Sequence, residues 1–346
     1  MVALFSSGVL ASTTIIGVLG QFPLNLTNGE TEMHGSLETI KDFHINESMS
    51  VKELVDQMRG SWGFTAEKVV KGVEVLEKMI ADKQCVKFLS FPACIVATGT
   101  RGIIKEIVKR RIADVVVTTC GTLDHDLARC WKDYYKGSFD LDDRMLHRQK
   151  LNRLGNILVP IDSYGIIIEQ KMQELLSAIW NEGIREISSR QLCREIGLRL
   201  CNEDSILYWA AKNNIPIYIP GLTDGAVGYQ IWLFSQNHKL KIDILKDEQE
   251  LNDLIFDSKK TGALVIGGGI SKHHVIWWNQ FKGGLDYAVY ITTAVEWDGS
   301  LSGAQVREAI SWGKVKETAK RVTIEGDATV LLPLMIAAII DKVKNG

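Results

Sequence analysis

The sequence predicts an α/β fold, namely a Rossmann-like, doubly wound parallel sheet with helices on both faces. From about residue 87 onward, short β-branched runs alternate with segments of helical periodicity. Several of these runs are apolar throughout, which is typical of strands that are covered on both faces. Many of them end in glycine-rich or acidic segments, as expected at a sheet edge that binds ligands.

The elements follow one another along a single domain that we expect to span residues 46–346. No internal repeat and no linker rich in proline or serine interrupts this part of the chain. Asp327 is a good N-cap for the apolar C-terminal helix. The expected strands are 87–91, 114–118, 156–160, 215–219, 263–266, 286–291 and 321–324, and the expected helices are 66–81, 101–111, 164–182, 190–200, 205–213, 247–258, 304–312 and 328–343.

The composition favours a soluble, cytoplasmic protein. The 346 residues carry a net charge of −2, which argues against a nucleic-acid binder, and 46% of them are hydrophobic. The six cysteines form no CxxC pair, so we expect reduced thiols and no structural zinc. No metal site is predicted.

The N-terminal residues 1–45 are expected to form a loosely ordered extension. Residues 2–22 are apolar and uncharged, but no lysine or arginine precedes them, and the first such residue is Lys41. A signal peptide needs a positively charged start, and glycine, serine and threonine dilute the run too much for a membrane span. The sequence therefore predicts no membrane association, with Met33 as a plausible true start.

The segment 302–314 predicts a short helix that presents one lysine. Ser302 and Gln305 have the spacing of a capping box, and Gly313 suits the left-handed residue that ends a helix. Lys314 then lies just beyond the helix end. A lysine whose pKa is lowered by its surroundings forms imines with carbonyl carbons. A solvated lysine that interacts with the helix dipole is the alternative interpretation.

Small or acidic residues follow several of the expected strands. Because parallel strands end at the same edge of a sheet, these segments should lie together and accept a nucleotide. No third metal ligand is evident beside His273 and His274, so a metal site formed by these two histidines is not favoured. The segments are 119–126, 220–225, 267–269, 292–294 and 326–328.

Residues 267–316 together with four shorter motifs resemble the deoxyhypusine synthase family, and the resemblance runs from about residue 61 to the C-terminus. The shorter motifs are 117–130, 152–160, 219–228 and 326–334. The resemblance implies an enzyme that uses NAD to oxidise spermidine and carries the aminobutyl group on a lysine as an imine. The group then passes to one lysine of the translation initiation factor 5A precursor. A homotetramer with active sites at subunit interfaces is also implied.

The resemblance also implies the roles of individual residues. Lys314 corresponds to the covalent lysine, and His273 is our candidate for proton transfer or amine orientation. The implied amine site consists of Asp124, His125, Gly299, Ser300, Glu308 and Trp312. The implied cofactor site consists of Thr119, Cys120, Gly121, Asp224, Gly268, Thr293, Ala294, Asp298, Asp327 and Ala328.

Three positions depart from the pattern of the family's eukaryotic members. His125, Tyr229 and Leu301 stand where those members carry acidic residues, and the altered motifs resemble the archaeal branch. Fewer carboxylates should weaken the binding of a polycation unless Asp124 or another acid substitutes. Two alternative functions therefore stay open. One is an aminobutyl transferase with a free amine acceptor, as in homospermidine synthesis. The other is a catalytically silent paralogue that binds NAD or a polyamine, although such a paralogue would not need Lys314 and Glu308.

Overall fold

The computed structural model describes residues 37–343. The chain separates into two compact units, Met1–Ile40 and Lys41–Gly346, and everything below concerns the second. The apolar run at 2–22 and the proposed start at Met33 lie outside the described residues. The expected domain boundary at residue 46 stays a prediction. Within 37–343, no helix has both the length and the apolar character needed to cross a membrane.

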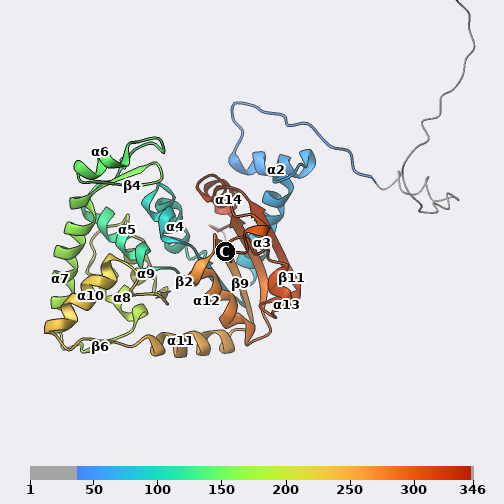
Figure 1. The fold of residues 1–346 in the computed structure, drawn as a ribbon. Helices are drawn as coiled ribbons and strands as arrows, with labels where there is room; N and C mark the ends of the chain where they lie inside the picture. Colours follow the sequence, from blue (N-terminus) through green and yellow to red (C-terminus); the bar gives the residue numbers. More distant parts are fainter. Residues whose placement is uncertain (1–36, 344–346) are drawn as a thin grey trace, which may run out of the picture. The chain divides into compact units, whose positions relative to one another are not determined.

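The centre of the second unit is a six-stranded sheet in the order β11-β10-β9-β1-β2-β7 (Figure 1). Every neighbouring pair of strands in this sheet is parallel, so all the carboxyl ends meet at one edge. This arrangement confirms the predicted α/β fold. The strands are β1 (Cys85–Ser90), β2 (Val115–Val117), β7 (Ile217–Tyr218), β9 (Lys260–Ile266), β10 (Leu285–Thr292) and β11 (Val315–Glu325).

Both faces of the sheet are buried, and successive strand residues alternate between two core clusters. In β9, Leu264 and Ile266 belong to the larger cluster, whereas Ala263 and Val265 belong to the smaller one. Helices α11 (Ile244–Asp257), α12 (Gly269–Gln280) and α13 (Glu308–Ser311) contribute to the smaller cluster. This two-sided burial explains why the strands read as continuous apolar runs.

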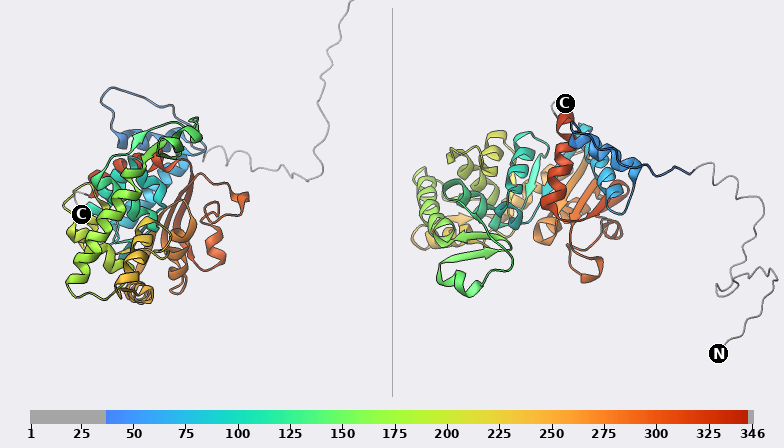
Figure 2. Two further views of the ribbon diagram at one scale, coloured as in Figure 1. Left: turned by 60° about the vertical axis from the view of Figure 1, so that its left-hand side comes forward. Right: turned by 90° about the horizontal axis from the view of Figure 1, so that it is seen from above.

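A second set of helices contributes to the larger cluster. The C-terminal helix α14 packs against α2 and α3, which is visible as red beside blue in the right-hand view of Figure 2. These helices are α2 (Val51–Ser61), α3 (Ala66–Ala81), α4 (Thr100–Lys109), α5 (Cys120–Trp131), α7 (Gly165–Asn181), α8 (Ser189–Arg199), α9 (Ile206–Asn213), α10 (Ala226–Asn237) and α14 (Ala328–Val343).

One predicted strand does not belong to the parallel sheet. Ile157–Pro160 is β5, which pairs antiparallel with β3 (Tyr135–Lys136) and β4 (Leu151–Leu154). Leu154 pairs with Ile157 across a two-residue turn, and Gly155 has a φ of 62°. This geometry is a tight β-hairpin, which the Gly-Asn sequence favours. Elements that the sequence did not predict include α2, β3 and β4 together with α6 (Asp143–Arg148), β6 (Glu186–Ile187) and β8 (Lys241–Ile242), with 3₁₀ turns at Ala93–Ala97, Ile161–Ser163 and Glu296–Asp298.

Helices α5 and α12 begin within the predicted strand-end segments, and α10 begins directly after one of them. Their glycine, aspartate and histidine residues obscured the helical periodicity in the sequence. In α12, for example, Val275, Ile276 and Asn279 are buried although polar residues precede them. The strand-end segments are therefore helix starts, and this changes what their backbone can bind.

Candidate functional site

Three helices start at the carboxyl edge of the sheet, each directly after a strand. Helix α5 follows β2, α12 follows β9 and α14 follows β11. The first N–H groups of a helix have no partner within it and carry a partial positive charge, so a helix start binds phosphate well. The predicted cofactor residues Thr119, Gly268 and Asp327 immediately precede these helices.

The backbone at this edge approaches its neighbours closely. A Cβ atom at Gly268 would lie 2.5 Å from the Cα of Ser302, and one at Gly225 would lie 2.7 Å from the Sγ of Cys120. Gly269 has a φ of 72° and open space where its Cβ would be. Gly268 and Gly225 thus allow close packing within the protein, and of these three glycines Gly269 leaves its backbone open.

The other predicted cofactor residues lie at the same strand ends but differ in accessibility. Cys120 is fully buried, and burial raises the pKa of its thiol. Gly121 packs against Ala93. Asp224 and Thr293 are exposed, and the amide of Ala294 donates to Thr292. Asp298 is exposed and accepts a hydrogen bond from the amide of Ser300 at 2.7 Å. Asp327 accepts from the amide of Thr329 at 2.8 Å and so caps α14, as the sequence predicted. Ala328 is the first residue of that helix.

Asp124 is enclosed by its own chain. Its carboxylate is 1% exposed and accepts hydrogen bonds from Tyr164 Oη at 2.7 Å and from the amides of Ala226 and Val227 at 2.9 and 2.8 Å. These amides are the first of α10, so Asp124 caps that helix in place of the glycine that precedes it. Burial raises the pKa of the carboxyl, against the hydrogen bonds that lower it. Nothing in this arrangement supports the predicted role of Asp124 in the amine site.

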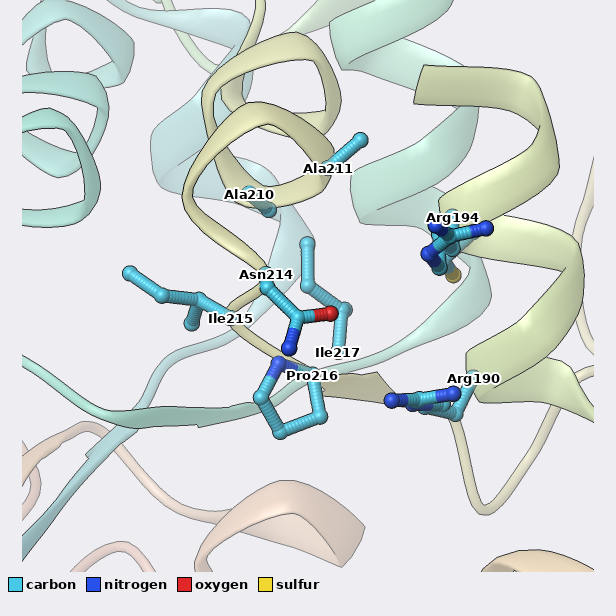
Figure 3. Close-up of a pocket in the computed structure, with 9 residues that line it drawn as sticks. Arg190, Arg194, Ala210, Ala211, Asn214, Ile215, Pro216 and Ile217 are labelled. Atoms are coloured by element: carbon cyan, nitrogen blue, oxygen red, sulfur yellow. The ribbon is translucent and has the colours of Figure 1, made fainter. Parts of the chain in front are cut away.

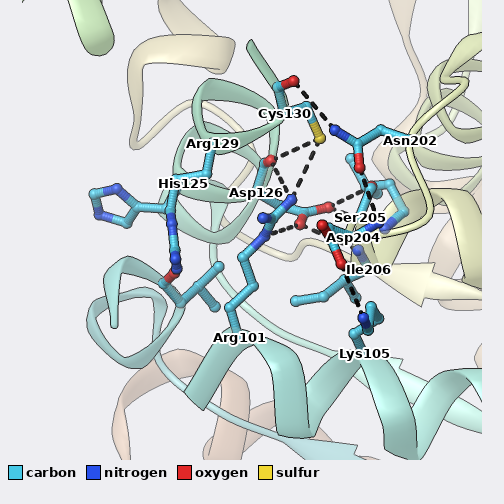
Figure 4. Close-up of polar contacts among 12 residues, drawn as sticks. Arg101, Lys105, His125, Asp126, Arg129, Cys130, Asn202, Asp204, Ser205 and Ile206 are labelled. Atoms are coloured by element: carbon cyan, nitrogen blue, oxygen red, sulfur yellow. Dashed lines mark hydrogen bonds and ion pairs between the residues drawn. The ribbon is translucent and has the colours of Figure 1, made fainter. Parts of the chain in front are cut away.

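Asp126 has a parallel role for α9. It pairs with Arg101 at 2.7 Å and accepts from Ser205 Oγ and from the amides of Ile206 and Leu207 (Figure 4). Its side chain is fully buried and that of Arg101 is 7% exposed. One turn of α5 therefore holds the starts of two other helices.

His125 lies between these two aspartates and is 8% exposed. Its Nδ1 lies 3.0 Å from Tyr134 Oη, and its ring contacts the rings of Tyr134 and Tyr164. Burial lowers the pKa of the imidazole to about 4, with a further contribution from Arg129. At neutral pH this side chain is uncharged, so it cannot replace a carboxylate in attracting a cation.

The two other departures have separate physical explanations. Leu301 is half-buried and packs against the smaller core cluster, so it stabilises its loop by apolar contact. Tyr229 is 55% exposed on α10, where its ring lies 5.5 Å from that of Trp232. Neither position gives a polycation a negative charge.

Lys314 lies at the opposite edge of the sheet from the strand ends. Its carbonyl accepts from the amide of Leu285, the first residue of β10, and it directly precedes β11. Gly313 before it has a φ of 67°, as the sequence predicted. The Nζ of Lys314 lies 5.0 Å from the ring centroid of Trp312, which is 62% exposed. The side chain of Lys314 thus lies beside an exposed aromatic ring.

The helix before Lys314 is shorter than predicted. Instead of 304–312, only Glu308–Ser311 is helical, and the predicted capping box is absent from this described segment. Ser302 contacts Gly268 instead, and the side chain of Gln305 donates to Glu325. Tertiary partners have replaced the local cap. Trp312 is consequently the C-cap of a one-turn helix rather than a residue on the face of a longer one.

The crossover segment, which we define as residues 293–314, connects the two edges. It leaves β10 at the carboxyl edge and returns to the start of β11. Gly299 and Ser300 lie on its exposed first part, and the exposed Glu308 lies near its end. His273 is exposed one turn into α12, and its pKa is lowered by burial and by the charge of Lys314. The predicted catalytic residues His273 and Lys314 therefore lie within electrostatic reach of each other.

The cavity drawn in Figure 3 does not contain these residues. It lies where α8, α9 and β7 meet, and Arg190, Arg194 and Asn214 line it. Its volume of about 10 Å³ holds no more than a water molecule. Within 37–343 no group of three or more His, Cys, Asp or Glu side chains is arranged to hold a metal ion.

Comparisons with known proteins decide the family. The family model described as deoxyhypusine synthase matches residues 53–339. The chain belongs to the deoxyhypusine synthase family. A relative from Picrophilus torridus, named probable deoxyhypusine synthase, is 54% identical over 301 residues, which cover 87% of this chain and 96% of that protein.

Other members of the family agree. Relatives of the same name from Thermoplasma acidophilum and Ignicoccus hospitalis are 52% and 47% identical, over 86% and 89% of this chain and 96% and 97% of their own lengths. A solved structure from Entamoeba histolytica, named "putative deoxyhypusine synthase", has a TM-score of 0.61 at 22% identity, covering 86% of this chain and 96% of that chain. That structure supports the fold alone. The three curated relatives named here are archaeal, the branch that the altered motifs resemble.

Proposed function

We propose that this chain is a deoxyhypusine synthase, which transfers the 4-aminobutyl group of spermidine to one lysine of the translation initiation factor 5A precursor with NAD as cofactor. Membership of the family supports a transferase of hypusine biosynthesis. The observation that carries the proposal is Lys314, an ammonium beside an exposed tryptophan at the end of the crossover segment.

The carboxyl edge of the sheet suits the cofactor. The starts of α5, α12 and α14 would bind the pyrophosphate, and Asp327 or Asp224 would hold a ribose. When bound, NAD supplies a hydride acceptor for an amine carbon and later returns the hydride. The protein's own residues bind and orient the amine and exclude water.

The crossover segment would bind the amine. Glu308 would pair with one ammonium group, while Gly299 and Ser300 would offer backbone and hydroxyl partners. His273 would accept or return a proton. The partial burial of its imidazole and the charge of Lys314 both favour the neutral form of His273, which can act as a base. Lys314 would attack the oxidised carbon, form an imine with the aminobutyl group and release 1,3-diaminopropane.

We also propose a homotetramer with active sites at subunit interfaces, as the resemblance implies. The backbone of Lys314 and the strand-end residues lie at opposite ends of β10 and β11. Active sites shared between subunits would let the carboxyl edge of one copy serve the lysine of another. We further propose a cytoplasmic enzyme whose partners are spermidine and the factor precursor.

The test is the adduct on Lys314. Incubation with NAD and spermidine, followed by borohydride reduction, should place a reduced aminobutyl group on the peptide that contains Lys314. Lys314→Ala should lower transfer at least about a thousandfold and leave NAD binding unchanged within about threefold. Lys320→Ala, a change at an exposed lysine on β11, is the matched control. Full transfer by Lys314→Ala would contradict the proposal.

A second candidate function follows from the three departures. His125 is neutral, Leu301 is half-buried against the smaller core cluster and Tyr229 is exposed, so none of the three supplies the carboxylate of the eukaryotic pattern, and a free amine is the alternative acceptor. A homospermidine-type transferase would pass the aminobutyl group to putrescine. Product analysis with putrescine as the sole acceptor separates the two functions. If neither product and no diaminopropane forms, a catalytically silent NAD- or polyamine-binding protein is favoured.

A further inference from the structure

Lys272 is a buried cation that the proposed reaction does not use. It directly precedes His273 on α12, but its side chain turns into the protein and is 1% exposed. Removing an ammonium group from water is costly unless acceptors replace the water. Burial lowers the pKa of Lys272 to about 8, and the carboxylate of Glu308 acts in the opposite direction.

The partners of Lys272 lie on the crossover segment. Its Nζ donates to the carbonyl of Leu301 at 2.6 Å and to the carbonyl of Ala304 at 2.8 Å. The same atom lies 4.4 Å from the ring centroid of Tyr290, a residue of β10 that is 1% exposed. One side chain of α12 thus binds the backbone of the crossover segment at two positions three residues apart.

The loop around these carbonyls is closely fitted. Ser300 Oγ accepts from the amide of Gly303, and its carbonyl accepts from the amide of Ala304. Gly303 has no room for a Cβ, which would collide with the carbonyl oxygen of Val295. On the other side, Ser302 contacts the backbone of Gly268. A contact that fixes residues 301 and 304 therefore also fixes Gly299 and Ser300.

We infer that Lys272 is a positioning residue. It holds the turn at residues 301–304 of the crossover segment against α12. In this way it sets the position of the amine-binding residues Gly299 and Ser300 relative to His273. The inference deepens the proposed function and rests on it for the identity of the amine. Because Lys272 contacts backbone carbonyls within the protein, its effect on the substrate passes through the loop. The role of the loop explains why a charged residue is kept at a buried position.

The experiment compares Lys272→Met with Lys282→Met in the full-length chain. Lys282 also donates to two backbone carbonyls, those of Ile255 and Phe256, but these lie at the end of α11. It is therefore a matched control for the loss of a lysine that binds carbonyls. Lys272→Arg keeps the charge and the donors, and it should restore part of the lost function.

We expect Lys272→Met to raise KM for spermidine about tenfold while kcat and the Kd for NAD change less than about threefold. Amide hydrogen exchange in residues 299–304 should become at least about tenfold faster in the same variant. Lys282→Met should change neither quantity. If Lys272→Met does not fold, Lys272→Arg serves in the same comparison, with smaller shifts in the same direction.

The outcomes separate this inference from the proposed function. Unchanged loop exchange in Lys272→Met overturns the inference, and so does faster exchange with an unchanged KM, because only a structural role would remain. If the wild-type protein releases no diaminopropane from spermidine, the proposed function fails. The amide exchange rates of residues 299–304 then test, without reference to activity, whether Lys272 holds this part of the crossover segment in place.

Discussion

Helix α5 and the crossover segment both carry acidic residues in motifs typical of ligand sites, but the protein uses them differently. Asp124 and Asp126 of α5 are 1% and 0% exposed, and their oxygens accept from the first amides of α10 and α9. Asp298 and Glu308 of the crossover segment are exposed. Acids of the same type thus serve as helix caps in one region and stay available to a ligand in the other.

The difference follows from what surrounds each segment. Helix α5 runs through the larger core cluster, where four of its apolar residues, Cys120, Leu123, Leu127 and Ala128, are buried. An aspartate buried there must find donors, and uncapped helix starts supply them. The crossover segment covers one side of the smaller cluster, so its acids remain in contact with solvent. The comparison therefore predicts stability effects in α5 and activity effects in the crossover segment.

The largest expected effect on stability is at Asp126. Asp126→Ala would leave the buried Arg101 without its charged partner and the amides of Ile206 and Leu207 without their acceptor, which should lower the free energy of unfolding by about 3–5 kcal/mol. Urea unfolding measures the change. Asp204→Ala is the control, because the Asp204 side chain is 76% exposed in its pair with Lys105 and should cost less than about 1 kcal/mol. Equal costs for the two changes would remove the distinction between cap and surface acid.

A smaller effect is expected from the protonation of His125. Its pKa is about 4 in the folded protein, against 6.5 for the free side chain, so the unfolded chain binds more protons between these values. Stability should therefore be full above about pH 6.5 and fall by up to about 3 kcal/mol as the pH drops to 4.

His125→Phe should flatten that part of the stability profile. Part of the slope should remain, because the pKa of His274 is also about 4 through burial. His147→Phe, at an exposed ring on α6, should leave the profile unchanged and is the control. A profile that keeps its full slope in His125→Phe would show that the buried ring is not the group that titrates.

The smallest effect on stability is expected in the crossover segment. Glu308→Gln should change the free energy of unfolding by less than about 0.5 kcal/mol, because the side chain is exposed. Its effect should instead appear as a KM for spermidine that is about tenfold higher. Urea unfolding and initial rates of diaminopropane release give the two numbers. A large loss of stability with an unchanged KM would place Glu308 with the acids of α5.

Several features could be predicted from local pattern alone. The helix 66–81 matches α3, because its apolar residues repeat with helical spacing. The positive φ of Gly313 and the cap at Asp327 were also predicted, since both depend on residues close in sequence. The helix expected at 304–312 was wrong because its cap depends on tertiary contacts. Ser302 contacts Gly268 and Gln305 donates to Glu325 in β11, so the two side chains do not cap the helix together.

The sequence by itself determined the parallel α/β architecture and the candidate lysine. Runs that are apolar throughout require burial on both faces, and the motif around Lys314 is local. Only the tertiary structure decided which polar groups are buried and form hydrogen bonds within the protein. Asp124 meets Tyr164 across 40 residues and Val227 across 103, and Lys272 meets its carbonyls 29 and 32 residues further on. Such partners are brought together by packing, because a buried charge must be satisfied by whatever donors or acceptors the fold places beside it.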